Sequence, residues 1–366
     1  MSTMVKILAT ADWQIGKAFG NIGQASDTFR EQLFSTAEYI IREVSKDFDL
    51  VLILGDTFDR SDADWSLIER MSELLRSSDK PIHIITGNHD YFHSGGVISA
   101  LKNELEDADH IFIHTEQEPH HIKSLNLTLY PGVLRSNPDF TDRVNWIPKR
   151  KKNDGLRIGM FHESIQPHGD FDPEVTLNHD LDMTLLGDHH GPAGNIEDSL
   201  IDQPSRKLWY AGSPEAQNIK HNWKGRVLGI EAEIGKEIIV EPIYVGKLKF
   251  EDVLFDFKED MDSPLELLSE KLGDIVGEQK LTYVRLCLTG EGKPETHEGL
   301  EDLLKQFKEN WPNNSIIKEQ FSVINDYTDS DKNLQEISEE LSSMNLTDEV
   351  LARSIILLRR YYRGIS

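Results

Sequence analysis

The chain has 366 residues, of which 38% are hydrophobic and 28% are charged, and its formal net charge is −25. This length allows two domains, and a membrane helix is not expected because no run of about 20 apolar residues occurs. The single cysteine, Cys287, excludes an internal disulfide and a thiolate zinc cluster, and we expect a cytoplasmic protein without a signal peptide. The negative charge argues against a broad surface for phosphate contacts.

Strands and helices are expected to alternate in the first part of the chain. Short apolar runs predict strands, and apolar residues at helical spacing predict amphipathic helices between them. This alternation is typical of βαβ units and a largely parallel sheet. The strands are expected over residues 5–10, 50–54 and 81–86, and the helices over 27–46 and 65–75 with Asp64 as the N-cap of the second.

Further short elements are expected up to about Gly246, where the α/β unit (residues 1–246) should end. The last two of its strands should pair with each other. A helix is expected over 97–105, and strands over 111–114, 125–130, 156–161, 183–186, 208–211, 226–233 and 238–245.

The pattern changes after residue 246. Residues 247–325 predict a small α+β domain with strands over 250–257 and 281–288, and none of its strands ends in a ligand-type residue. Residues 326–366 begin as an acidic linker and end in an amphipathic stretch with an apolar stripe and several arginines. We expect this tail to form a helix that docks a partner, and the alternative is that it packs on its own domain.

Polar residues follow the apolar strands of the α/β unit at the point where each strand ends. Because ligands bind at the carboxyl ends of strands in open α/β sheets, these side chains should share one site. Carboxylate, amide and imidazole groups suit manganese, iron, zinc or magnesium, and two ions can clamp a phosphoryl group and lower the pKa of water. The strand-end residues are Asp12, Asp56, Asn88, His162, Asp188 and His190, of which Asp56 could bridge two ions.

The order of these blocks resembles the calcineurin-like metallophosphoesterases. The family pattern DxH, GDxxD, GNHD, H and GHxH is matched here by DxQ, GDTFD (55–59), GNHD (87–90), His162 and GDHH (187–190). The GDTFD block and the YAGSP block (210–214), followed by KGRVL (224–228), are similar to the SbcD-type nuclease branch. The resemblance implies a two-sheet sandwich flanked by helices, followed by a capping domain and a helical tail.

The resemblance also implies roles for single residues. His89 would be the general acid or transition-state stabiliser, and Asp59 would orient it, because a carboxylate that accepts from one imidazole nitrogen fixes the tautomer. Asn88 would stabilise charge on the phosphate. One metal ion would be held by Asp12, Gln14, Asp56 and His190, and the second by Asp56, Asn88, His162 and Asp188.

Two residues depart from the family pattern. Gln14 stands where the family has His, and it offers a weaker, neutral oxygen ligand. Asp188 stands where the first His of GHxH is expected, and its charge favours Mn²⁺ or Mg²⁺ over zinc. We expect two divalent ions, with Mn²⁺ preferred; a mononuclear site, or His189 as a replacement ligand, are the alternatives.

Other basic and histidine residues are weaker candidates. The basic run Lys149, Arg150, Lys151 and Lys152 could contact a DNA backbone, or it could be a solvated surface loop. Histidines 114, 120 and 121 could bind a further metal, although loop histidines are more often bystanders, and His168 could line the cleft.

The function expected from these patterns is metal-dependent hydrolysis of DNA phosphodiesters, as an exo- or endonuclease in DNA repair, recombination or DNA defence. The acidic composition suggests that an SbcC-like, SMC-type ATPase delivers the DNA, and a homodimer would be consistent with the family. Two alternatives stay open at this point: a phosphodiesterase of small nucleotides, and a catalytically weakened scaffold subunit of an ATPase complex.

Overall fold

The computed structural model describes residues 4–20, 22, 26–151, 154–165, 169, 171–191, 204–221, 223–258, 261–292, 294–318 and 322–323. The chain divides into two compact units. The first comprises residues 1–251 and 277–283, and the second comprises residues 252–276 and 284–366. Among the described residues, no helix combines the length and the apolar character needed to cross a membrane.

A six-stranded sheet forms the first layer of strands in the first unit, in the order β11-β10-β1-β2-β3-β4. Its central strands are parallel, so their carboxyl ends lie at the same edge, and β10 and β11 add an antiparallel pair. The strands are β1 (Val5–Thr10), β2 (Leu50–Leu54), β3 (Ile82–Ile85), β4 (Ile111–Ile113), β10 (Arg226–Ala232) and β11 (Ile239–Tyr244).

A five-stranded sheet forms the second layer, in the order β5-β6-β7-β8-β9. Strands β6 to β9 are parallel, and β5 pairs antiparallel with β6. The strands are β5 (His120–Ile122), β6 (Leu127–Pro131), β7 (Leu156–His162), β8 (Met183–Gly187) and β9 (Leu208–Tyr210). Strand β5 was not predicted, because its three residues include two histidines and form no apolar run.

Alternation along the strands explains why the two sheets pack face to face. In β2, Leu50, Leu52 and Leu54 join a core shared with strands of the second sheet, whereas Val51 and Ile53 join the core under the helices. Both faces of this strand are therefore buried, as expected for a parallel sheet covered on both sides.

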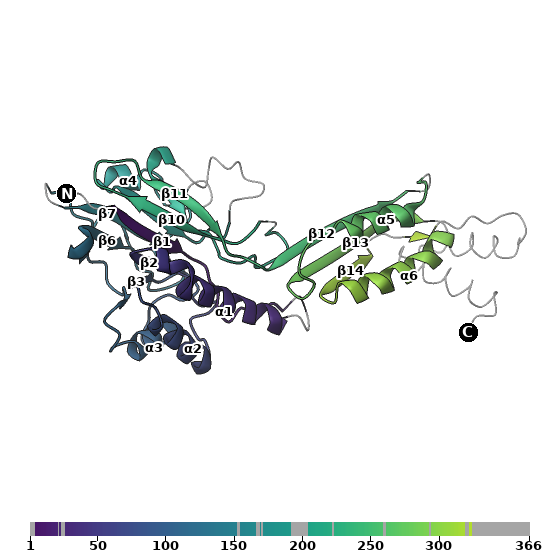
Figure 1. Cartoon of the computed structure of the whole chain (residues 1–366), viewed down its shortest axis with the longest axis horizontal. Helices are drawn as coiled ribbons and strands as arrows, with labels where there is room; N and C mark the ends of the chain where they lie inside the picture. Colours follow the sequence, from purple (N-terminus) through teal and green to yellow (C-terminus); the bar gives the residue numbers. More distant parts are fainter. Residues whose placement is uncertain are drawn as a thin grey trace, which may run out of the picture. The chain divides into compact units, whose positions relative to one another are not determined.

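Helices cover the outer faces of both sheets (Figure 1). The helices α1 (Ser26–Arg42), α2 (Trp65–Arg76) and α3 (Val97–Glu104) pack on the first sheet, and the short α4 (Val175–Asn178) packs on the second. Asp64 is the N-cap residue of α2, but its side chain makes no capping hydrogen bond. Short 3₁₀ turns lie at Val44–Asp47, Lys123–Leu125 and Pro204–Arg206. The predicted two-sheet sandwich flanked by helices is confirmed.

The second unit is a small α+β fold with its own core. Its sheet has the order β12-β13-β14, with β15 paired to β13, and Phe257, Leu268, Leu286 and Leu300 are buried between the sheet and its two helices. Strand β12 begins at Lys249 in the first unit. The elements are β12 (Lys249–Phe257), α5 (Pro264–Gly273), β13 (Thr282–Gly292), α6 (Pro294–Asn310), β14 (Asn314–Lys318) and β15 (Ser322–Val323). The partner-binding helix expected within residues 326–366 lies outside the described residues.

Candidate metal centre

Strands from both sheets deliver polar side chains to one edge of the sandwich. His162, the last residue of β7, lies at the middle of this group. Its Nε2 is 3.0 Å from Oδ1 of Asn88 and 3.5 Å from Oδ1 of Asp56, which follow β3 and β2 of the first sheet. The same Nε2 is 3.8 Å from Oδ1 of Asp188 and 4.0 Å from Oδ1 of Asp12. The structure therefore brings these five predicted ligands together.

The other two predicted ligands, His190 and Gln14, lie at the side of Asp12 and Asp56. Nε2 of His190 is 3.6 Å from Oδ1 of Asp12. The Gln14 amide donates from Nε2 to Oδ2 of Asp56 at 2.6 Å, while its Oε1 is buried without a hydrogen-bond partner. In this arrangement Gln14 holds the Asp56 carboxylate in place and keeps one oxygen atom available as a ligand.

The carboxylate of Asp12 shows that this group fits a cation. Asp12 is fully buried, and neither carboxylate oxygen has a hydrogen-bond partner. Burial raises the pKa of Asp12 well above its usual range, and the neighbouring carboxylates of Asp56 and Asp188 raise it further. Because buried carboxylates are normally paired or coordinate a metal, an ion between these oxygens would supply the missing partner.

His162 is oriented so that one defined nitrogen faces the carboxylates. Its Nδ1 lies 2.8 Å from the main-chain oxygen of Leu54, which can only accept, so Nδ1 carries a proton and donates. Burial lowers the pKa of His162, but the nearby carboxylates, first of all Asp56, outweigh burial and raise the pKa well above its usual range. The site thus binds a positive charge at this position, and a metal ion could replace the Nε2 proton.

Carboxylate and imidazole groups of this cluster also meet the distance requirement for a shared ion. Ligand atoms of Asp12, Asp56 and His162 lie within 4.8 Å of one another, and all three residues are buried. When bound, divalent ions at such a site polarise a phosphoryl oxygen and lower the pKa of water. The residues that would hold them are Asp12, Gln14, Asp56, Asn88, His162, Asp188 and His190.

Unusual backbone geometry accompanies these ligands. Asp12, Gln14, Asp56 and Asp188 all have positive φ, at 53°, 52°, 51° and 78°. Such a conformation costs about 1–3 kcal/mol in a residue other than glycine and is concentrated at functional sites. All four of these residues belong to the predicted ligand set.

Glycines before the ligands make room for them. A Cβ atom on Gly87 would lie 2.1 Å from Oδ1 of Asp56, and a Cβ on Gly55 would lie 2.5 Å from Nδ1 of His162. Gly55 also has a φ of 85°, which favours glycine. The GD and GN pairs of the sequence therefore have a steric reason: the first residue must lack a side chain so that the ligand groups can approach one another.

A known protein family covers most of the first unit. The family model for calcineurin-like phosphoesterases matches residues 5–220, which is more than half of the chain. The chain belongs to the calcineurin-like phosphoesterase family. Comparison with curated proteins gives no match. Among solved structures, TT1561 of Thermus thermophilus is similar with 10% identity and a TM-score of 0.39, covering 66% of this chain and 100% of that one. Another has 11% identity and a TM-score of 0.38, with 66% and 99% covered.

Asp90 supports the loops that carry the ligands of the phosphoesterase centre, a role that was not predicted. It is fully buried, and its carboxylate accepts from the main-chain nitrogens of Gly87 at 2.7 Å, Asp56 at 3.2 Å and Phe58 at 3.2 Å. Burial raises its pKa to about 6, with a further contribution from Asp56. Asp90 thus ties the loop after β2 to the loop after β3. The final Asp of GNHD was the available signal.

The predicted pairing of His89 with Asp59 differs in the structure. Nδ1 of His89 lies 2.8 Å from the main-chain oxygen of Asp59 and not from its carboxylate. The Asp59 carboxylate instead accepts from Nζ of Lys17 at 3.1 Å. Lys17 therefore binds the carboxylate of Asp59, and the main-chain oxygen of Asp59 orients the imidazole of His89. The expectation that the Asp59 carboxylate orients His89 is therefore wrong for this structure.

Further polar residues donate hydrogen bonds to the predicted ligands Asp188 and Asp12. The Ser164 hydroxyl donates to the carboxylate of Asp188. The main-chain oxygen of Asp12 accepts from the Ser213 hydroxyl at 2.9 Å and from the Gln217 amide at 2.7 Å. Single polar residues after a strand gave no signal for these roles in the sequence.

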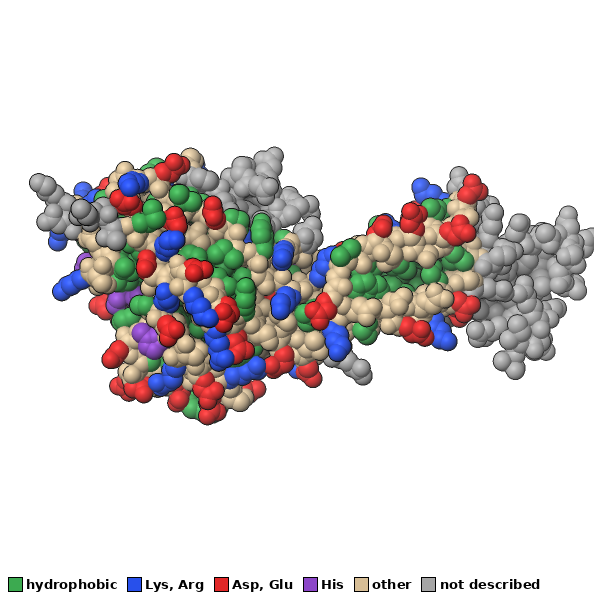
Figure 2. Space-filling view, viewed as in Figure 1, with side chains coloured by type: hydrophobic (Ala, Val, Ile, Leu, Met, Phe, Trp, Pro, Cys, Tyr) green, Lys and Arg blue, Asp and Glu red, His purple; other side chains and the backbone are tan. Residues whose placement is uncertain are grey.

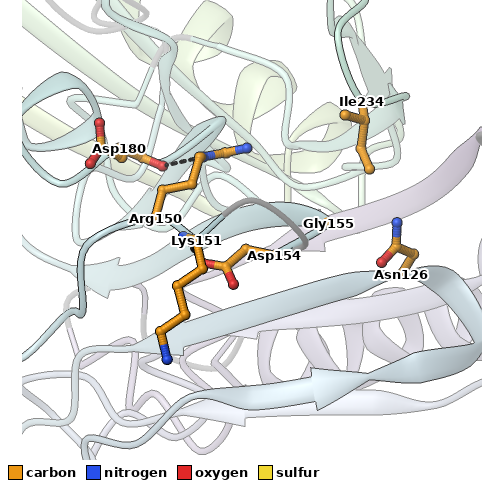
Figure 3. A pocket seen from close by; sticks show the side chains of 7 residues that line it. All are labelled: Asn126, Arg150, Lys151, Asp154, Gly155, Asp180 and Ile234. Carbon is orange, nitrogen blue, oxygen red and sulfur yellow. Dashed lines mark hydrogen bonds between the residues drawn. The ribbon is translucent and has the colours of Figure 1, made fainter.

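The basic run lies at the opposite end of the strands from the metal centre. Lys149, Arg150 and Lys151 precede β7, whereas His162 ends it, and the seven residues of β7 span roughly 20 Å. Arg150 and Lys151 line a pocket of about 700 Å³ with residues that precede β6, β7 and β8 and with Ile234, which follows β10. Figure 3 shows these side chains. Arg150 is paired with the carboxylate of Asp182. These residues cannot contact a phosphate at the metal centre, and Lys152 lies outside the described residues.

The histidines that were expected in loops lie in strand β5 or in contact with it. His120 and His121 belong to β5, and His120 meets His83 and His114 in what we call the imidazole cluster. Nδ1 of His83 is 3.2 Å from Nε2 of His114, and both side chains are buried. His121 bonds Thr128 at 2.9 Å. His168, the expected cleft residue, lies outside the described residues.

Proposed function

We propose that this phosphoesterase is a metal-dependent nuclease that hydrolyses phosphodiester bonds of DNA, of the SbcD type. The observation that carries the proposal is the open outer side of the centre. Buried Asp12, Asp56 and His162 form its floor, while the side chains of His89, Asp188 and His190 are 43%, 29% and 24% exposed. As far as the described residues show, a phosphate within a long chain can therefore reach the ligands without its neighbours entering a closed pocket.

His89 is the residue placed to assist the leaving oxygen. Its Nε2 faces the centre, 3.9 Å from Oδ2 of Asp56, while its Nδ1 is held by the main chain. A protonated imidazole in this position donates from Nε2 to the oxygen that departs from phosphorus. Asn88 directly precedes His89, and its side-chain amide lies 3.0 Å from Nε2 of His162, where it could contact a phosphate oxygen.

The ligand set favours Mn²⁺ or Mg²⁺. Asp12, Asp56, Asp188, Asn88 and Gln14 offer oxygen atoms, and imidazole is a minor part of the set. Carboxylate and carbonyl oxygens suit these hard ions better than they suit zinc.

DNA delivery by a partner is part of the proposal. The formal charge of −25 opposes long-range attraction to a polyanion, and on the face shown in Figure 2 Lys and Arg side chains are interspersed with Asp and Glu. An SbcC-like, SMC-type ATPase in the cytoplasm would compensate by binding the DNA itself, and a homodimer would place two centres on one substrate.

The test is cleavage of labelled single- and double-stranded DNA with Mn²⁺ or Mg²⁺, beside hydrolysis of bis-p-nitrophenyl phosphate. We expect Mn²⁺-dependent DNA cleavage that falls about 10²- to 10⁴-fold in His89→Ala. His121→Ala is the matched control, because His121 lies opposite Thr128 near the amino end of β6. Equal cleavage by His89→Ala would contradict the proposed role.

A phosphodiesterase of small nucleotides is the second candidate, and the net charge of −25 favours it because a small substrate feels little repulsion from an acidic protein. Turnover of the small ester without any DNA cleavage, with and without a partner ATPase, would select this function. A catalytically weakened scaffold subunit is the third candidate, because Gln14 and Asp188 depart from the family pattern. Absence of any metal binding would select this function.

A further inference from the structure

The loop between β6 and β7 (residues 132–147) begins at the edge of the sandwich that carries the metal centre. Leu134 is bonded through its main chain to the Thr86 hydroxyl at 2.8 and 2.9 Å, and its oxygen accepts from the nitrogen of Phe92 at 2.9 Å. The Asn137 amide donates to the main-chain oxygen of Asn88 at 3.0 Å. The loop is therefore fixed to the segment that carries Asn88 and His89.

A second set of contacts fixes the loop to the other sheet. Arg143 pairs with the carboxylate of Glu163, which follows His162 directly. The same guanidinium donates to the main-chain oxygens of Asp139 at 3.3 Å and Thr141 at 3.0 Å. Ligand-bearing segments from both sheets thus hold this loop beside the centre.

Phe140 lies between two residues whose positions are fixed. The Asp139 carboxylate accepts from Thr141 at 2.9 Å (main chain) and 2.6 Å (hydroxyl), and from the nitrogen of Arg135 at 2.7 Å. Between them, the Phe140 side chain is 90% exposed, more than any other large hydrophobic side chain in the described part of the chain. A ligand that covered this ring would gain about 1.5–3 kcal/mol from its burial.

A nucleobase fits this ring better than a protein surface does. A stable protein interface buries more than about 1,000 Å² with several apolar side chains, whereas among the described residues of this loop Phe140 is the one large exposed hydrophobic side chain. A single aromatic ring beside a phosphate site is the arrangement with which proteins stack the bases of single-stranded nucleic acids. Phe140 is three residues from Asn137, which places its Cα within about 11 Å of the residue that contacts Asn88.

We propose that Phe140 is a stacking platform for a base of the nucleic-acid substrate, close in the strand to the phosphate that is hydrolysed. This inference rests on the proposed nuclease function and names the contact that positions its substrate. Stacking accepts every base, so Phe140 adds affinity for unpaired nucleic acid and little sequence preference.

The test measures binding of a single-stranded oligonucleotide by the full chain, in the His89→Ala background so that the strand is not cut. We expect Phe140→Ala to weaken binding about 5- to 150-fold, and Phe140→Trp to retain it. Tyr39→Ala is the matched control, since Tyr39 is a 51%-exposed aromatic residue on α1. Equal melting temperatures would show that the variants fold alike.

A strand with one abasic nucleotide, moved along its length, separates stacking from general adhesion. For the protein that has Phe140, one position of the abasic nucleotide should weaken binding as much as the Phe140→Ala substitution weakens binding of the intact strand. The Phe140→Ala variant should bind the intact strand and this abasic strand equally well. If the protein with Phe140 cleaves and binds DNA while Phe140→Ala binds equally well, the stacking role alone is overturned. Hydrolysis of the small ester with no DNA binding at all overturns both the nuclease function and the stacking role.

Discussion

The two ends of the parallel strands in the first unit contrast sharply. At the carboxyl ends, buried Asp12 has two carboxylate oxygens without a hydrogen-bond partner, and its neighbours have strained backbone. At the amino ends, Arg157 is just as buried, yet it donates to Asp154 at 2.7 Å and to the main-chain oxygen of Pro148 at 2.5 Å, and it lies 4.6 Å above the ring of Tyr130.

This contrast distinguishes a reactive edge from a structural one. Buried charges are normally paired within the folded protein, because an unpaired buried charge costs several kcal/mol. A buried carboxylate whose oxygens accept no hydrogen bond inside a well-packed protein therefore implies a partner from outside. The amino edge holds its charges for stability, and the carboxyl edge holds them for a ligand.

The largest effect should come from removing a ligand charge. Asp56→Asn should lower metal-dependent hydrolysis more than about 100-fold, because even residues that only support a ligand cost about 10- to 100-fold. Divalent ions should also raise the melting temperature of the unmodified protein and not that of the variant, since only a native site binds them. Asp154→Asn makes the same change at the amino edge and should leave turnover within twofold. A similar loss there would break the contrast.

A smaller effect should follow when the support behind the ligands is removed. Asp90→Asn should weaken metal affinity about 10- to 100-fold, because the hydrogen bonds to the nitrogens of Asp56, Gly87 and Phe58 lose their charged acceptor. Metal titration followed by melting temperature measures this. Unchanged affinity would show that the loops hold their positions without Asp90.

The imidazole cluster allows a test of whether a buried atom that lacks a hydrogen-bond partner, far from the metal centre, lowers the stability of the protein. Nε2 of His83 is such an atom, and burial, with His114 and His120 beside it, lowers the pKa of His83 to about 2. Since the unfolded chain titrates near 6.5 and binds more protons, stability should be full above pH 6.5 and fall as the pH drops toward 2. His83→Phe should remove about 2 kcal/mol of this loss at pH 5. Chemical denaturation of both proteins at pH 7.5 and pH 5 measures the difference.

The smallest effect should come from the basic run. Replacing Lys149, Arg150 and Lys151 together by Ala should leave hydrolysis of DNA within twofold, because these residues lie at the opposite edge from the centre. Loss of the exposed pair between Arg150 and Asp182 should cost at most about 1 kcal/mol. The measurements are turnover and denaturant midpoint. A tenfold loss of DNA binding would mean that substrate extends along the sandwich to this edge.

The residue pattern predicted most strands of the first unit because they are buried and read as apolar runs, and the family resemblance implied their arrangement as a two-sheet sandwich. The predicted ligands meet because the carboxyl ends of the parallel strands lie at one edge of the sandwich. The three residues of β5 were missed, since neither alternation nor an apolar run marks them. The position of the basic run was available in the sequence: residues 149–152 precede the strand over 156–161, so they had to lie at its amino end.

Contacts that depend on competition between groups were beyond the sequence. Nothing in the order of residues shows that Lys17 takes the carboxylate of Asp59 and leaves its carbonyl to His89. The support from Ser213 and Gln217 to the oxygen of Asp12 joins residues that are 201 and 205 positions apart in the chain. Such long-range polar contacts follow only from the folded arrangement.

The hydrogen bond from His162 to the main-chain oxygen of Leu54 joins the two sheets at one point, since Leu54 ends β2 and His162 ends β7. The ligands divide in the same way, with Asp12, Asp56 and Asn88 on one sheet and His162, Asp188 and His190 on the other. A bound ion would therefore link the two sheets of the sandwich. Metal supply would set not only turnover but also how readily the two halves of the domain separate, so a chelator should speed amide hydrogen exchange in both sheets at once.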